Sequence, residues 1–308
     1  MCPHDGTRRK SGLSTEMTVE QPAATPRLLA QLRDWLAEDL GRGDLTASAL
    51  SGRRAQARWI AKQDGVFCGG SLALQLFRQL DPELEAECLV ADGVVVRCGD
   101  TLLRLDGQAT ALVGAERTAL NLAMRLSGIA TATAELVSQL QGSGVRLADT
   151  RKTTPGLREL EKYAVRMGGG VNHRMGLDDA AMLKENHLAW AGGVKPAIAA
   201  VRASAPWPAR VIVEAETEQE AVEAVTAGAD AVLLDEFTPG QLSMLVPRLR
   251  QLADERAGAG AVVLEASGIQ PGDLRAYADT GVDLISTSAP VTRSRWLDLS
   301  MRFAPAGG

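Results

Sequence analysis

The sequence has few cysteines and no long apolar segment, and each shortage argues against a class of protein. Its four cysteines, Cys2, Cys68, Cys88 and Cys98, form no C-x-x-C pair and show no metal-ligand spacing, so neither a disulfide scaffold nor a zinc site is indicated. Reduced thiols are typical of a cytoplasmic protein, which is the location we expect. Because no apolar run approaches the roughly 18–20 residues of a membrane helix, no membrane association is expected.

The sequence also lacks an excess of positive charge. Its 308 residues carry a formal net charge of −5, and the pI is about 5.4. A nucleic-acid-binding surface needs a broad basic face, so no nucleic-acid partner is expected. The length is sufficient for one large domain or two unequal domains with an ample core.

The first 26 residues are polar and mixed in composition, and we expect them to form a disordered tail. Arg8, Arg9 and Lys10 are not followed by the apolar segment of a secretory signal. A helix is predicted over residues 27–40, where leucines and Trp35 recur at helical spacing.

Residues 27–128 are predicted to form a small α+β sandwich domain. Short apolar runs alternate there with Gly and Asp turns, and helices are predicted near residues 72–80 and over 116–127. Beyond this point strands and helices alternate, which indicates a parallel sheet over residues 129–287. Residues 288–308 are predicted to return to the first domain. The strands expected in the second domain lie at residues 145–148, 180–183, 211–213, 231–234, 262–264 and 282–285.

Charged or hydroxyl side chains stand at the end of every one of these strands. They are Asp149–Lys152, Lys184, Glu214, Asp235, Glu265 and Ser286–Ser288. In an α/β barrel all strands end at one mouth, where the active site lies. An open doubly wound sheet binds ligands only at its switch point. The pattern therefore favours a TIM-like α/β barrel, although any one of these residues alone has the simpler interpretation of a helix cap.

Positive charge is concentrated in the middle of this second domain. Arg151, Lys152, His173, Arg174 and Lys184 lie in three short segments separated by apolar residues and glycines. Arginine binds carboxylates through two parallel hydrogen bonds, and lysine supplies a point charge to phosphate. The residues together predict a site for a small, dense polyanion, whereas each alone is also compatible with a surface ion pair.

Two carboxylates and two serine-containing turns complete the predicted site. Glu214 and Asp235 indicate Mg²⁺ held together with a diphosphate, or simply balance the nearby positive charge. The Ser267-Gly268 and Ser286–Ser288 turns follow the last two strands, where barrels often bind phosphate through backbone N–H groups. An anionic substrate, a diphosphate and a metal ion are the requirements of group transfer from a phosphorylated sugar.

Several longer segments resemble the quinolinate phosphoribosyltransferase family, which has the type II phosphoribosyltransferase fold. The resemblance runs from about residue 30 to 303, and its segments are Glu38–Thr46, Glu116–Asn121, Leu126–Thr131, Asp149–Arg158, Lys162–Arg166, Asn172–Gly176, Lys184–His187, Leu264–Gly268 and Leu297–Arg302. It implies an incomplete TIM-like α/β barrel with a smaller N-terminal α+β sandwich domain. It also implies a homodimer, or a higher homo-oligomer, with shared active sites.

The activity that the resemblance implies is a decarboxylating transfer. Quinolinate and phosphoribosyl diphosphate would give nicotinate mononucleotide, CO₂ and diphosphate, in de novo NAD biosynthesis. Arg117 would come from the partner subunit and contact the pyridine dicarboxylate. Arg151, His173 and Arg174 would bind the same substrate.

The same resemblance implies roles for the remaining site residues. Lys152 and Lys184 would lie between quinolinate and the sugar donor. Glu214 and Asp235 would face the ribose hydroxyls and the Mg²⁺–diphosphate, with a metal link that is indirect, through diphosphate or water. These two lysines and two acids are the expected catalytic residues. The 5-phosphate would be bound by Ser267, Gly268, Ser286, Thr287 and Ser288.

The chain departs from the family pattern at a few positions. Ile269 stands where a second glycine is common, and Ser288 and Thr292 stand where the last loop often carries a Gly and a His. Glu185 and Glu236 stand where Asp and Asn are frequent. The first two departures concern the predicted phosphate site.

Three other functions remain open at the level of sequence. One is a paralogue acting on another aromatic acid, including relatives associated with molybdenum transport. Another is a lyase that forms a Schiff base through Lys152 or Lys184, although Glu214 and Asp235 oppose the lowered lysine pKa that this needs. The third is a non-catalytic barrel that binds an effector. The full set of cations favours a dicarboxylate substrate over the first alternative, and retention of both acids and all cations argues against the third.

Overall fold

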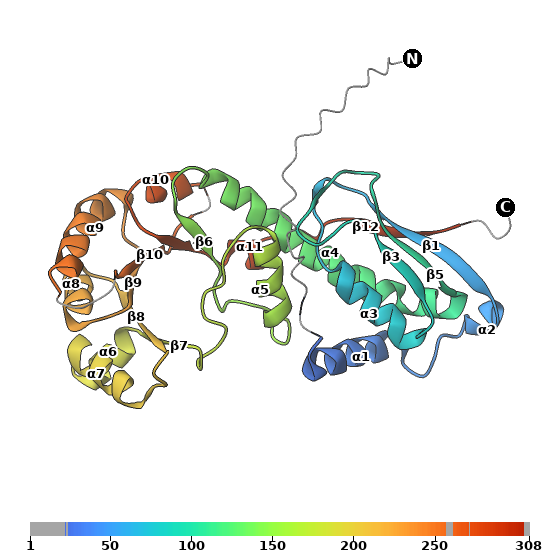
Figure 1. Ribbon diagram of the computed structural model, residues 1–308, viewed down its shortest axis with the longest axis horizontal. Coiled ribbons are helices and arrows are strands. Elements are labelled where there is room, and N and C mark those ends of the chain that lie inside the picture. The colour runs from blue at the N-terminus through green and yellow to red at the C-terminus, as the bar shows by residue number, and fades with distance from the viewer. Residues whose placement is uncertain (1–21, 23, 257–260, 271, 305–308) are drawn as a thin grey trace, which may run out of the picture.

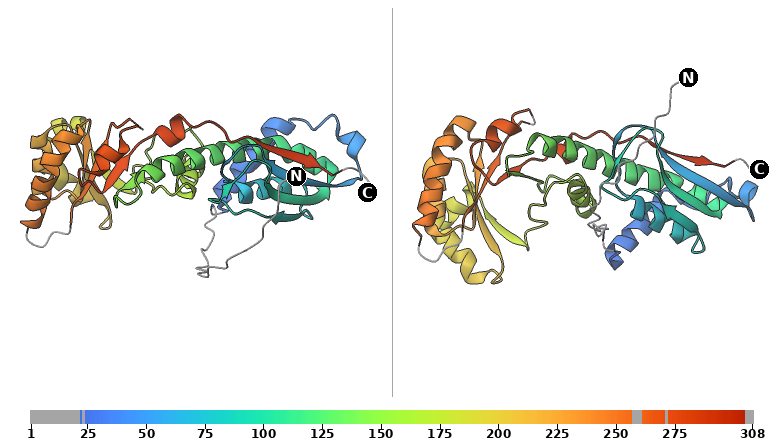
Figure 2. Two further views of the ribbon diagram at one scale, coloured as in Figure 1. Left: turned by 90° about the horizontal axis from the view of Figure 1, so that it is seen from above. Right: turned by 45° about the horizontal axis from the view of Figure 1, so that its top comes forward.

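The structure, a computed structural model, describes residues 22, 24–256, 261–270 and 272–304. Most of the tail predicted for residues 1–26 lies outside this part of the chain. Two lobes are joined by one long helix that runs through the middle of the molecule (Figures 1 and 2). One lobe contains a four-stranded antiparallel sheet and the other a six-stranded parallel sheet. Within the described ranges, no helix has the length and apolar character needed to cross a membrane.

The first lobe is a sheet covered by helices on one face. Its strand order is β12-β1-β5-β3, with all three pairings antiparallel. The elements of the lobe are α1 (Pro26–Leu40), α2 (Ala47–Leu50), β1 (Arg54–Ala61), β2 (Gly65–Val66), α3 (Gly70–Leu80), β3 (Glu85–Cys88), β4 (Val95–Val96), β5 (Thr101–Gln108) and β12 (Leu299–Phe303). Helix α1 begins as the sequence predicts, because Thr25 caps it through a 3.1 Å hydrogen bond from the N–H of Leu28.

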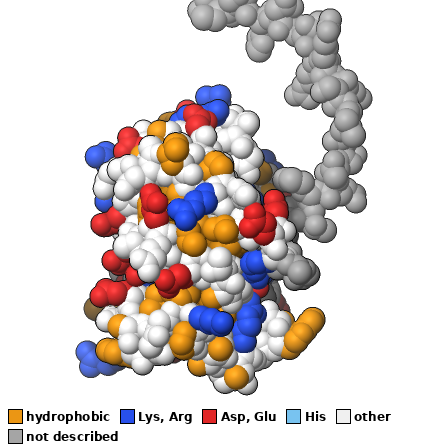
Figure 3. Space-filling model, turned by 90° about the vertical axis from the view of Figure 1, so that its left-hand side faces the viewer, with side chains coloured by type: hydrophobic (Ala, Val, Ile, Leu, Met, Phe, Trp, Pro, Cys, Tyr) orange, Lys and Arg blue, Asp and Glu red, His pale blue; other side chains and the backbone are white. Residues whose placement is uncertain are grey.

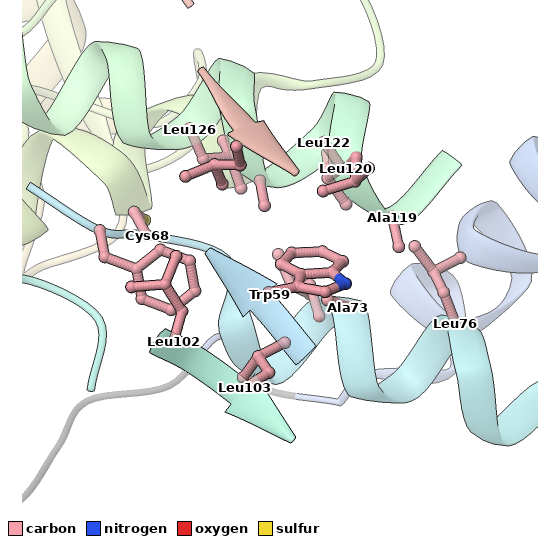
Figure 4. Packing of buried hydrophobic residues seen from close by; sticks show 14 of the residues in the cluster. Trp59, Cys68, Ala73, Leu76, Leu102, Leu103, Ala119, Leu120, Leu122 and Leu126 are labelled. Carbon is pink, nitrogen blue, oxygen red and sulfur yellow. The ribbon is translucent and has the colours of Figure 1, made fainter. Parts of the chain in front are cut away.

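The core of this lobe lies between the sheet and helices α3 and α4. Trp59 of β1 is fully buried and meets Phe77 of α3 edge-on, with ring centroids 6.1 Å apart. Figure 4 shows Trp59 between Leu103 of the sheet and leucines of α4. Strand β12 comes from the other end of the sequence, so its pairing with β1 ties the chain's last described segment to this lobe.

Helix α4 (Ala109–Gln139) is much longer than the helix predicted over residues 116–127. Its N-terminal half packs in the core of the first lobe, and Leu136 packs in the core of the second. The domain border predicted at residue 128 therefore falls inside one continuous helix. Gly128 sits where the C-terminal segment crosses, since a Cβ there would lie 2.0 Å from the carbonyl oxygen of Arg295.

The second lobe has the strand order β6-β11-β10-β9-β8-β7, and every pairing is parallel. Strands that follow each other in the sequence are neighbours from β7 to β11, and β11 then pairs with β6. That is the order of a barrel, and it stays incomplete because no β6–β7 pairing occurs among the described residues. The strands are β6 (Arg146–Ala148), β7 (Ala180–Leu183), β8 (Arg210–Ala215), β9 (Ala231–Asp235), β10 (Val263–Ser267) and β11 (Leu284–Ser286).

Helices surround this partial barrel on its outside (Figure 1). They are α6 (Glu185–Ala191), α7 (Val194–Ser204), α8 (Glu218–Ala227), α9 (Pro239–Asp254) and α10 (Leu274–Ala278). Helices α5 (Arg158–Met167) and the short α11 (Ala289–Thr292) lie beside α4 instead (Figure 1), and buried apolar residues of both join the core of the first lobe. Thr217 and Thr238 begin α8 and α9 with capping boxes. On the face that carries α8 and α9, acidic and basic side chains are interspersed (Figure 3), so no basic surface gathers there.

Some elements differ from the sequence-based expectation. Strands β3 and β12 and helix α6 were not predicted. Strand β4 is only two residues long, and helix α10 begins at Leu274. Strands β3 and β12 owe their state to pairing with distant strands, which local periodicity does not contain.

Candidate active site

A cavity of about 520 Å³ lies at the carboxyl ends of the barrel strands. Most of the predicted site residues line it, namely Arg151, Lys152, His173, Arg174, Lys184, Glu214, Asp235, Ser267 and Ser286. The structure thus brings together cations, acids and serines that lie far apart in the sequence. Further lining residues are Asp149, Thr150, Arg158, Met182, Leu233 and Glu265.

Strand alternation explains why these side chains converge. On β10, Val263, Glu265 and Ser267 alternate with buried Leu264 and Ala266. Glu265 and Ser267 line the pocket, while Val263 packs against the small apolar cluster beneath it. The sequence analysis placed Glu214, Asp235 and Glu265 at strand ends; Glu265 instead lies in mid-strand, one layer deeper than Ser267.

The three acids at the mouth, Glu214, Glu216 and Asp235, are close together, and two of them already have partners. Glu214 pairs with the ammonium of Lys184, and Asp235 accepts a hydrogen bond from Ser267. Carboxylate oxygens of Glu214, Glu216 and Asp235 all lie within 4.8 Å of one another. Such a group of hard oxygen atoms fits Mg²⁺.

Glu216 was missed by the sequence analysis. It stands two residues after Glu214, a spacing that places both on the same side of an extended chain. Although its side chain is exposed, partial loss of solvent and then the neighbouring carboxylates Glu185, Glu220, Asp235 and Glu214 raise the pKa of Glu216. Crowding of negative charge at this edge favours a bound cation.

Positive charge is crowded on the opposite side of the pocket. Burial, and then the charge of Arg151, lowers the pKa of Arg174 from its ordinary value. One guanidinium nitrogen of Arg174, Nη1, donates to the carbonyl oxygen of Ala180 at 3.1 Å, which aims the side chain along β7. An anion bound between Arg151 and Arg174 relieves their mutual repulsion.

His173 is held at both nitrogens of its ring. Nδ1 accepts the backbone N–H of Arg174 at 2.7 Å, and Nε2 lies 3.2 Å from Oε2 of Glu265. The backbone N–H of His173 donates to Asp149 at 2.8 Å. Buried Lys162 pairs with Asp149 and also donates to the carbonyl oxygen of His173 at 3.0 Å.

Four predicted residues lie outside this pocket. Gly268 has a φ of 77°, a conformation that side chains disfavour, and a Cβ there would lie only 3.0 Å from Cγ of Glu236. Thr287 donates its backbone N–H to Ala148, and Ser288 begins the short helix α11. Arg117 lies on α4 and lines a separate cavity of about 430 Å³.

The cavity around Arg117 shares no lining residue with the barrel pocket. Arg117 lies there beside Glu38, Asp39 and Arg125. Within one described chain Arg117 is therefore not part of the cationic cluster at the barrel mouth.

Asp149 and Glu265 were not assigned to the site from sequence, although both stood in the predicted strand-end pattern. Their signal was weak because a single acid near a strand end has many structural explanations. Ile269, the first departure from the family pattern, is buried in the core of the second lobe. It therefore contributes to packing where a glycine would contribute only backbone.

Comparison with known families agrees with this geometry. The description "Quinolinate phosphoribosyl transferase, N-terminal domain" matches residues 44–127. The description "Quinolinate phosphoribosyl transferase, C-terminal domain" matches residues 129–302. Together the two matches span both lobes.

Individual relatives are similar over nearly the whole chain. A probable nicotinate-nucleotide pyrophosphorylase [carboxylating] of Synechocystis sp. is 44% identical over 273 residues, which cover 88% of this chain and 90% of that protein. The nicotinate-nucleotide pyrophosphorylase [carboxylating] of Mycobacterium leprae is 39% identical, over 88% and 95% of the two chains. The solved structure of the nicotinate-nucleotide pyrophosphorylase from Francisella tularensis superposes with a TM-score of 0.85 at 35% identity, covering 92% of this chain and 99% of that one.

Proposed function

Since the chain belongs to the quinolinate phosphoribosyl transferase family, we propose that it converts quinolinate and phosphoribosyl diphosphate to nicotinate mononucleotide, CO₂ and diphosphate. This is a pentosyl transfer with a coupled decarboxylation, a step of de novo NAD biosynthesis. One observation carries the proposal. A single pocket is lined both by Arg151 and Arg174 and by the acids Glu214 and Asp235.

The basic side of the pocket suits the dicarboxylate. The guanidinium groups of Arg151 and Arg174 bind carboxylates in a fixed plane, and their mutual repulsion falls when the dianion enters. Lys152 and Lys184 line the same pocket, and Lys184 pairs with Glu214. They are therefore placed to bind the diphosphate that leaves.

The acidic side suits the sugar. The ring nitrogen of quinolinate attacks the anomeric carbon as the bond to diphosphate breaks, and positive charge develops on the ribose. The carboxylates of Glu214 and Asp235 stabilise that charge. Ser267 and Ser286, at the ends of β10 and β11, supply hydroxyl groups for the 5-phosphate.

Decarboxylation follows from the first step. Once the ring nitrogen carries the ribose, it is a pyridinium. The bond from C2 to its carboxylate then breaks, CO₂ leaves, and the electron pair stays on C2 beside the positive nitrogen until C2 takes up a proton. No organic cofactor is needed to hold these electrons.

Mg²⁺ is the proposed metal, and the acids at the mouth are the residues that would hold it. Glu214, Glu216 and Asp235 offer closely grouped carboxylate oxygens, and their engagement by Lys184 and Ser267 favours a link through diphosphate or water. A bound Mg²⁺ would neutralise charge on the diphosphate. The proposal also includes a homodimer or larger homo-oligomer in the cytoplasm, with Arg117 completing the neighbour's pocket.

Turnover by the purified chain tests the proposed function. With quinolinate, phosphoribosyl diphosphate and Mg²⁺, we expect CO₂ and nicotinate mononucleotide in equal amounts, and loss of both products when the metal is chelated. Arg174→Ala is expected to lower kcat/KM for quinolinate by about 100-fold or more, because a buried charged contact to a carboxylate is lost.

The matched control for that variant is Arg202→Ala. Arg202 is an arginine of the same barrel that pairs with Asp230 at 3.0 Å, next to the amino end of β9 and away from the mouth. Its removal is expected to change kcat/KM by less than about threefold. Tight quinolinate binding without CO₂ release would instead support a non-catalytic effector-binding protein.

A further inference from the structure

The proposed function leaves Glu265 without a role, and we propose that Glu265 is a positioning residue that fixes the imidazole of His173 and, through it, Arg174. The inference rests on the proposed function, because it concerns how the dicarboxylate side of that pocket is held. Glu265 acts through His173 and is not assigned a contact with substrate.

Glu265 carries a buried carboxyl group in the interior of the barrel, where such a group is unfavourable without a partner. It lies in the middle of β10, is only 1% exposed, and points into the barrel, where it lines the pocket. Oε2 lies 3.2 Å from Nε2 of His173, and Oε1 is buried without a hydrogen-bond partner among the described residues. Burying a carboxyl group is costly unless the group has a partner. The contact with His173 supplies that partner, so it is strongly favoured over an arrangement in which both carboxyl oxygens lack one.

The other ring nitrogen determines which atom of this contact carries the proton. Nδ1 of His173 accepts the backbone N–H of Arg174 at 2.7 Å, so it carries no proton. The ring proton is then on Nε2, which faces Oε2 of Glu265 at 3.2 Å. Rotation of the ring breaks both contacts, so Glu265 locks the ring, and the ring locks the backbone of Arg174.

The rest of His173 is held from the other side of the barrel. Asp149, which directly follows β6, accepts the backbone N–H of His173, and Lys162 donates to its carbonyl oxygen. Within the described chain β6 and β7 do not pair with each other, and a single bridge between Ala148 and Val171 ties this segment to β6. Beyond that bridge, the contacts of Asp149 and Lys162 hold His173 at the opening of the barrel.

The consequence is a preformed site for the dicarboxylate. A guanidinium that is already in position loses less conformational freedom on binding. Without the contact from Glu265, the ring of His173 and the start of the Arg174 segment gain freedom that quinolinate must remove. The acidic side of the pocket does not depend on this contact.

Kinetics of two substitutions test the inference. Glu265→Ala is expected to raise the KM for quinolinate about tenfold or more, and to leave the KM for phosphoribosyl diphosphate within about threefold of wild type. Glu265→Gln is expected to restore the quinolinate KM to within about threefold of wild type, because its amide oxygen accepts the same Nε2–H. Equal changes in both KM values, or failure of Gln to rescue, would overturn the assignment.

A buried acid in the first lobe provides the matched control. Asp81 is 1% exposed and accepts backbone N–H groups of Glu83 and Gln108. Asp81→Ala is expected to lower thermal stability as Glu265→Ala does, without a selective change in the quinolinate KM. A selective change in this control would show that loss of stability alone produces the effect.

Nitrogen-15 NMR of histidine tests the contact without turnover. The chain has only three histidines, so the ring signals of His173 are identified by their loss in His173→Gln. We expect the Nε2–H tautomer, with a ring proton protected from solvent exchange in wild type and Glu265→Gln and exposed in Glu265→Ala. The Nδ1–H tautomer, or identical exchange in all three proteins, would refute the inference. Absence of turnover in wild type would refute only the proposed function.

Discussion

At the scale of single residues, the pocket is a set of charges that are already paired before substrate arrives. Lys184 contacts Glu214, Ser267 donates to Asp235, and His173 contacts Glu265. Arg151 and Arg174, by contrast, lie close enough for their charges to repel. In the proposed reaction the bound dianion relieves this repulsion, and diphosphate competes with Glu214 for Lys184.

The loop after Arg174 gives a pH-dependent prediction. The carboxylate of Asp179 accepts the backbone N–H groups of Met175 and Gly176 at 2.6 and 3.0 Å. Burial alone raises the pKa of Asp179, but these N–H groups outweigh it and hold the pKa below its ordinary value of 3.8. Since the folded pKa is the lower one, the stabilisation is present above the unfolded pKa and is lost as pH falls through the folded pKa.

We expect Asp179→Ala to lower the free energy of unfolding by roughly 1 kcal/mol at pH 7, because the carboxylate is exposed and its hydrogen bonds are screened by water. The difference from wild type should shrink as pH falls from 4 toward 3. Urea denaturation of both proteins across this range measures it. A difference that stays constant or grows below pH 4 contradicts the assignment of Asp179.

At the scale of elements, helix α4 organises both lobes. Its residue Arg125 donates to the carbonyl oxygen of Val291 and to Ser294, and the N–H of Leu297 donates to Met124. These hydrogen bonds hold against α4 the segment that runs from the barrel back to β12 in the first lobe. The close crossing at Gly128 is the point where this return path touches the helix.

Gly128→Ala is expected to destabilise the protein by about 2–4 kcal/mol, because backbone atoms of the crossing segment must move away. Gly114→Ala on the same helix is the control: its Cβ would meet only the side chains of Leu40 and Leu80, at 3.3 Å, and alanine gains about 0.5–1 kcal/mol of helix preference. Calorimetry of both variants tests the difference. Equal stability of the two would show that the crossing is not tight.

The helices and strands also show which parts of the fold could be predicted from the sequence. The parallel strands, their order of appearance and the charged residues at their ends were predicted, because burial and strand endings leave local patterns. The long course of α4, the pairing of β12 and the contacts of Asp149 and Glu265 were not, because they depend on residues distant in sequence. Periodicity identifies which side chains face a core, but it does not show which distant group a buried carboxyl will meet.

At the scale of the whole molecule, one chain does not bring all predicted substrate-binding residues together. The barrel mouth holds Arg151 and Arg174, whereas Arg117 lines a separate cavity on α4. The proposed dimer resolves this separation if the α4 surface of each subunit covers the barrel mouth of the other. In such an arrangement, a mixed dimer with a mouth defect in one subunit and an Arg117 defect in the other has both defects in the same site, so its second site is intact.

Subunit mixing therefore tests the composite pocket most directly. Arg117→Ala and Lys184→Ala are each expected to be nearly inactive with quinolinate and phosphoribosyl diphosphate. Equal amounts of the two, exchanged under mild denaturation and returned to native buffer, should regain about a quarter of wild-type activity, because half of the dimers are mixed and each of these contains one intact site. Activity that remains at the level of the parent variants after exchange, with mixed dimers confirmed by mass spectrometry, would contradict a pocket shared between the barrel mouth and the partner's Arg117.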